Sequence, residues 1–75
     1  MTGTESETNR HYTQVLQARQ QAAHALYEAE LALHDAHRSQ VDQWIKAASD
    51  RLHIAVVRHL EADALVRQLE LVTAA

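Results

Sequence analysis

Apolar residues recur along the chain at alternating intervals of three and four residues, beginning at Tyr12. This spacing places them in two columns on one side of a helix, as in the heptad repeat of a coiled coil. One column contains Tyr12, Arg19, Leu26 and Leu33, and the other contains Val15, Ala22, Ala29 and Ala36. The pattern predicts a helix that packs along these two columns.

A second heptad pattern follows the first and is out of phase with it. Its columns contain Ile45, Leu52, His59 and Val66, and Val41, Ala48, Ala55, Ala62 and Leu69. Val41 comes five residues after Ala36, whereas a stutter or stammer in a continuous coiled coil inserts four or three residues. The break therefore predicts that the chain reverses direction near residue 40.

The residues at the break favour one helix end followed by one helix start. His37 and Arg38 suit the carbonyl end of a helix, where positive charge is stabilised. Ser39 can accept hydrogen bonds from backbone N–H groups, and Asp42 suits the positive first turn of the next helix. We expect a helical hairpin over residues 10–72, with helices at about 9–38 and 40–72, a turn at about 38–41, a disordered tail at 1–9 and a frayed end at 73–75.

Folding the second helix back on the first brings large residues opposite small ones. When Ala36 is paired with Ile45, the next layers are Leu33 with Ala48, Ala29 with Leu52, and Leu26 with Ala55. Alternating volumes allow dense packing between helices. The sequence therefore predicts an all-α fold, an antiparallel two-helix hairpin with an alanine-rich coiled-coil seam. Two alternatives stay open: the alanines fall into these columns by chance, or the chain is one continuous helix within a long dimer.

The composition favours helix and limits how a core can be completed. The chain has 75 residues with one Gly, no Pro and no Cys, so glycine and proline turns and disulfides are scarce or absent. A chain of this length buries only roughly 60% of the surface that its unfolded form exposes. Association with another chain is the simplest way to bury more.

The apolar residues left outside the seam predict where that association occurs. We expect contacts between chains at Tyr27, Leu31, Trp44, Leu60 and Leu65. A third column of small residues, Ala18, Ala25 and Ala32, flanks the seam on the first helix, with Trp44 and Leu65 on the matching flank of the second. The simplest assembly is a homodimer, in which two hairpins form a four-helix bundle. A helical partner of different sequence and a monomer are the alternatives.

Arg19 and His59 form a polar layer within the predicted seam. Long or amphipathic side chains can extend out of a seam while their apolar parts stay inside. Alternatively, a polar layer fixes the register or the partner, and histidine makes such a layer sensitive to pH near neutrality.

Glu30, His34 and His37 lie on one side of the first helix at a spacing that can bind zinc or a similar cation. The second helix offers no convergent ligand, and Arg51, one of the residues opposite, repels cations. We therefore expect no metal and no cofactor, and we interpret the histidines as solvated helix surface. A metal-binding helical bundle stays an alternative.

Charge and motifs argue against several function classes. The formal net charge is −3, with acids and bases interspersed, so the basic patch typical of nucleic-acid binding is missing. A small nucleic-acid-binding regulator nevertheless stays an alternative. The sequence contains neither a glycine-rich phosphate loop nor a serine nucleophile elbow. We expect that the chain is not an enzyme.

The sequence also bears on location. It contains no run of roughly 18 uncharged apolar residues, the length that membrane insertion requires. Its opening, MTGTESETNR, is polar and acidic, whereas a secretory signal is basic and then apolar. A cytoplasmic location is the default expectation, with signal-independent secretion left open.

The predicted hairpin is similar in form to the small secreted helical-hairpin proteins of the WXG type, which carry a tryptophan near the turn. Trp44 occupies that place, but Ile45 and Lys46 follow it, so the glycine of the family signature is absent. The resemblance is limited to form and assigns no function. From its residues, the chain is predicted to be a small protein–protein interaction or regulatory adaptor module that acts through self-association or binding of a partner helix.

Overall fold

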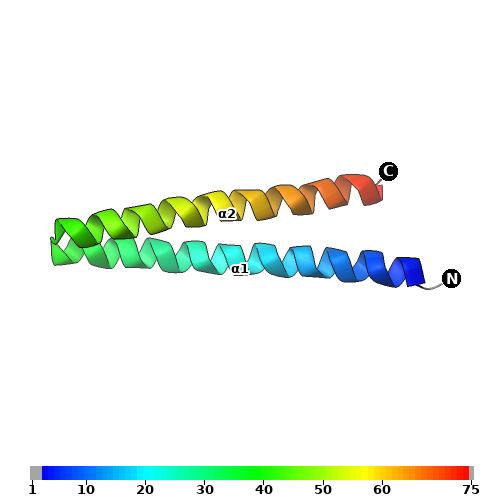
Figure 1. The fold of residues 1–75 in the computed structure, drawn as a ribbon, viewed down its shortest axis with the longest axis horizontal. Coiled ribbons are helices and arrows are strands. Elements are labelled where there is room, and N and C mark those ends of the chain that lie inside the picture. Colours follow the sequence, from blue (N-terminus) through cyan, green and yellow to red (C-terminus); the bar gives the residue numbers. More distant parts are fainter. Residues whose placement is uncertain (1–2, 75) are drawn as a thin grey trace.

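The computed structural model describes residues 3–74, which form two long helices joined by a short turn (Figure 1). Helix α1 spans Gly3–Ser39 and helix α2 spans Asp42–Ala74. The helices run antiparallel, so the start of α1 and the end of α2 lie at the same end of an elongated molecule with principal-axis extents of 60 × 18 × 13 Å. The predicted all-α hairpin is confirmed, and residues 3–74 contain no strand.

The helices extend further than the sequence predicts. α1 begins at Gly3 instead of near residue 9, and α2 continues to Ala74 instead of residue 72. The disordered tail at residues 1–9 and the frayed end at 73–75 stay predictions, and residues 1, 2 and 75 lie outside the described part. Extending a formed helix adds a hydrogen bond for each residue fixed, and residues 4–9 contain neither glycine nor proline to interrupt it.

The turn consists of Gln40 and Val41, within the predicted range. Gln40 has a positive φ of 61°, and its N–H donates to the His37 carbonyl at 3.2 Å. This left-handed residue after the last turn closes α1 as glycine commonly does. His37 and Arg38 lie in that last turn, as predicted.

Ser39 differs from its predicted role as the cap of α2. It is the last residue of α1, where its hydroxyl donates to the Ala36 carbonyl and accepts from the Val41 N–H at 3.3 Å. The Val41 carbonyl instead accepts the first hydrogen bonds of α2, from the N–H groups of Trp44 and Ile45 at 3.1 and 3.0 Å. Asp42 lies in the first turn of α2, as predicted.

Replacing Gln40 with glycine is expected to raise the free energy of unfolding by about 0.5–1 kcal/mol, because a side chain with a Cβ is strained in the left-handed region and glycine is not. Urea denaturation measures this change. The matched control, Gln68→Gly, is exposed in the interior of α2 and should lower the free energy of unfolding by about 0.5–1 kcal/mol. Equal losses in the two variants would contradict the left-handed turn.

The core is a single layer of side chains between the two helices. Its buried members are Val15, Ala29, Ala36, Ala55, Ala62 and Val66, and all of them belong to the predicted columns. Every other position of those columns is half-buried. The heptad pattern therefore identified the side of each helix that faces the other, whereas interlocking of individual side chains as in a coiled coil stays a prediction.

Candidate functional site

A groove runs along one side of the hairpin, between α1 and α2. Its floor consists of alanines, which come from both helices: Ala18, Ala22 and Ala25 of α1, and Ala47, Ala55 and Ala62 of α2. Each of these side chains is a single methyl group, so the floor lies lower than the bulkier residues on either side. The predicted third column contributes Ala18 and Ala25 to this floor.

The wall of the groove on α2 is both apolar and charged. Ile54 and Leu65 are its bulky apolar members, with 51% and 53% of their surface exposed. Its charged members are Asp50, Arg51, Arg58 and Glu61. The lining residues of α2 run from Ala47 to Leu65, which corresponds to about 27 Å of helix. A groove of this length and lining matches the size and chemistry of another amphipathic helix.

The predicted interface residues are all exposed, but they do not share one surface. Leu65 lines the groove. Trp44 lies three heptads before Leu65, nearer the turn and on the same side of α2. Leu60 comes five residues before Leu65, so the two point about 140° apart around α2. One docked helix can contact only one of these two leucines.

Tyr27 and Leu31 form a separate apolar pair on α1. They lie one turn apart, both are exposed, and neither lines the groove. Sequence reasoning grouped them with Leu65 because it counted apolar residues outside the seam without fixing their direction. The predicted interface does not include Ile54, although its spacing of eleven residues from Leu65 places both on one side of α2.

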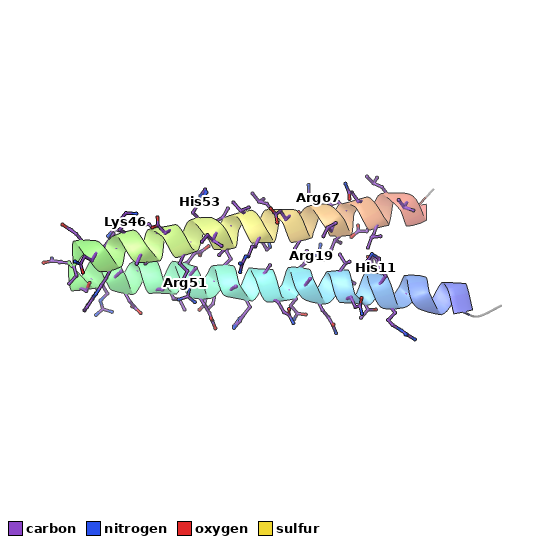
Figure 2. The ribbon with its side chains drawn as sticks, in the orientation of Figure 1. His11, Arg19, Lys46, Arg51, His53 and Arg67 are labelled. Carbon is purple, nitrogen blue, oxygen red and sulfur yellow. The ribbon has the colours of Figure 1, made fainter. Side chains whose placement is uncertain are left out.

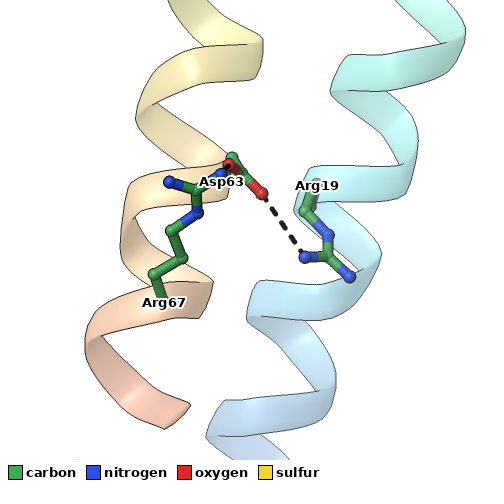
Figure 3. Close-up of polar contacts among 3 residues, drawn as sticks. All are labelled: Arg19, Asp63 and Arg67. Atoms are coloured by element: carbon green, nitrogen blue, oxygen red, sulfur yellow. Dashed lines mark hydrogen bonds and ion pairs between the residues drawn. The ribbon is translucent and has the colours of Figure 1, made fainter. Parts of the chain in front are cut away.

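The polar layer joins the helices through a residue that sequence reasoning missed. Figure 3 shows the Arg19 guanidinium of α1 directed at the Asp63 carboxylate of α2, with Nη1 and Oδ1 3.4 Å apart. Asp63 also pairs with Arg67 on its own helix, at 3.0 Å. Continuing the predicted layers by one heptad beyond Leu26 with Ala55 places Ala62 opposite Arg19. Asp63 directly follows Ala62 in the sequence, and this adjacency is the signal that points to the contact.

Arg19 extends out of the seam, where its side chain is partly exposed. His59 is half-buried and lines the same small recess as Arg19 and Asp63, on the side of the hairpin opposite the alanine groove. An ion pair this accessible contributes at most about 1 kcal/mol. The ion pair therefore adds little to the free energy of unfolding.

A second ion pair links the helices nearer the turn. Arg51 Nη2 lies 3.9 Å from Glu28 Oε2, and Glu28 also contacts His24 at 2.8 Å. Figure 2 shows that Lys46 and His53 instead project from the outer side of α2, away from α1. Lys46 pairs with Asp50, whose carboxylate lies 3.0 Å from Nζ. Two of the four charges on the groove wall, Asp50 and Arg51, thus already have partners.

The three metal candidates are exposed side chains on α1. Among the residues that the structure describes, no group of three His, Asp or Glu side chains converges on a possible cation position. Glu30, His34 and His37 are accordingly not part of any such group, and the absence of a metal stays a prediction. Neither described helix carries an apolar stretch of the length needed to traverse a bilayer.

Comparison of the chain with protein families, with curated proteins and with solved structures gives no match.

Proposed function

We propose that this chain is a protein–protein interaction module that acts through self-association, with two hairpins forming a four-helix bundle. In this proposal it works as a regulatory or adaptor protein, by binding and not by catalysis. The observation that carries the proposal is the groove between α1 and α2, where an alanine floor lies beside the exposed Ile54 and Leu65.

The thin core supports the same proposal. A single layer of mostly small side chains buries little apolar surface, while many large apolar residues stay exposed. Each Å² of apolar surface removed from water contributes about 25 cal/mol. Covering the groove with another helix therefore adds a second layer to the core of a chain that is short for an isolated domain.

Sedimentation equilibrium of the full chain, beside Leu65→Glu and Leu60→Glu, tests the proposal. We expect the wild type to form a dimer and Leu65→Glu to raise the dissociation constant at least about tenfold, because it places a carboxylate in the apolar groove. Leu60→Glu is the matched control: the same change at an exposed leucine outside the groove, which should leave the constant within about threefold.

A wild type that stays monomeric at all accessible concentrations would contradict self-association. If only Leu60→Glu disrupts the dimer, the interface lies on the side of α2 that carries Leu60, outside the groove.

A further inference from the structure

Two charges on the groove wall have no partner within the described chain. The side chains of Arg58 and Glu61 both line the groove, and neither side chain forms an ion pair or hydrogen bond with any residue among 9–72, whose side chains the structure describes. They have opposite signs and lie three residues apart, on the same side of α2. Burying either charge without a partner is unfavourable, so a docked helix has to supply complementary charges.

The apolar wall residues are placed symmetrically about these two charges. Ile54 comes four residues before Arg58, and Leu65 comes four residues after Glu61. The wall therefore reads apolar, basic, acidic, apolar in one direction along α2, and apolar, acidic, basic, apolar in the other. A second α2 running antiparallel presents the complementary order.

We propose that the groove is occupied by α2 of a second copy of this chain, antiparallel, with Arg58 opposite the partner's Glu61 and Ile54 opposite the partner's Leu65. The inference rests on the proposed self-association and specifies its surface and register. A two-fold axis between the copies makes each of these contacts occur twice. The same register places Ala47 opposite the partner's Val72, which is otherwise exposed.

The charges also disfavour the parallel arrangement of the two α2 helices. In a parallel two-fold pair each residue faces its own copy, so Arg58 would lie against Arg58 and Glu61 against Glu61. Like charges that face each other repel, whereas in the antiparallel register each Arg58 faces a Glu61 and attracts it. The alanines of α1, Ala18 and Ala25, lack bulk and let the second helix approach the floor.

Charge reversal tests the register with the full chain. Arg58→Glu and Glu61→Arg should each raise the dimer dissociation constant at least about tenfold, because each change creates two repulsive contacts per dimer. The two changes combined in one chain should restore it to within about threefold of the wild type. Arg10→Glu, an exposed reversal outside the groove, is the matched control and should have no effect on the constant.

Mixing the two single variants separates docking from folding. If a substitution weakens the folding of its own chain, that loss persists when the two variants are mixed. A heterodimer of Arg58→Glu with Glu61→Arg, however, has two attractive pairs and no repulsive one. We expect the equimolar mixture to associate about as tightly as the wild type, while circular dichroism shows the same helix content in all variants.

Crosslinking gives a measurement that does not depend on affinity. The chain contains no cysteine, so cysteines placed at Ile54 and Leu65 together should be joined between chains by a short thiol-specific crosslinker. Ile54→Cys alone should not crosslink, because its two copies lie about 16 Å apart in this register. Crosslinking of Ile54→Cys alone would show a different register.

The outcomes distinguish the two proposals. A wild-type dimer that is insensitive to both charge reversals, or a mixture that fails to associate, overturns the register and leaves self-association standing. A monomeric wild type overturns both.

Discussion

Replacing Val66 with aspartate is expected to unfold the hairpin. Val66 is fully buried, with 0% of its surface exposed, and it is the largest such side chain among the described residues. A carboxylate there replaces a buried apolar side chain between the two helices, at a cost of several kcal/mol. Small domains are stable by only about 5–15 kcal/mol, and a chain this short lies at the low end.

Far-UV circular dichroism and urea denaturation measure the effect of Val66→Asp as a loss of helix or of the unfolding transition. The control is Val57→Asp, the same change on the same helix at an exposed position, which should cost about 1 kcal/mol or less. Similar stabilities for the two variants would show that Val66 does not face α1 in solution.

Replacing Ala29 with leucine is expected to lower the free energy of unfolding by about 2–3 kcal/mol. Ala29 is fully buried, with 0% of its surface exposed, so the three added carbons of leucine have to push α2 away or adopt strained rotamers. Helix propensity does not explain such a loss, since leucine ranks close to alanine.

Urea denaturation of Ala29→Leu beside Ala64→Leu isolates the packing effect. Ala64 is exposed on α2 and lines neither the groove nor the recess, so its replacement should change the free energy of unfolding by less than about 0.5 kcal/mol. If both variants are equally stable, the helices are not in close contact at the alanines.

The heptad columns predicted the fold because periodicity alone determines which side of a helix is apolar. Each column position, from Tyr12 to Leu69, is buried or half-buried. The five-residue break after Ala36 likewise placed the turn correctly, since two out-of-phase patterns cannot share one straight helix. These features depend on spacing, which the sequence shows directly.

The site depended on features that spacing does not show. The contact between Arg19 and Asp63 depends on how far a guanidinium extends out of the seam, and a heptad assignment does not fix that reach. Gln40 adopts the left-handed conformation, which sequence analysis normally recognises because glycine or asparagine occupies the position. The groove becomes visible only when the alanines of two helices are seen together.

The reversal at Gln40 and Val41 has a consequence for how the helices can slide. The alanines recur at seven-residue intervals on both helices. If α2 were shifted along α1 by two turns, its large residues would still lie opposite small ones. Such a slip requires about 10 Å of spare connecting chain, and two residues held by hydrogen bonds on both sides supply no slack. The two-residue turn thereby fixes a single alignment of α2 along α1, although the repeated alanines alone are compatible with several.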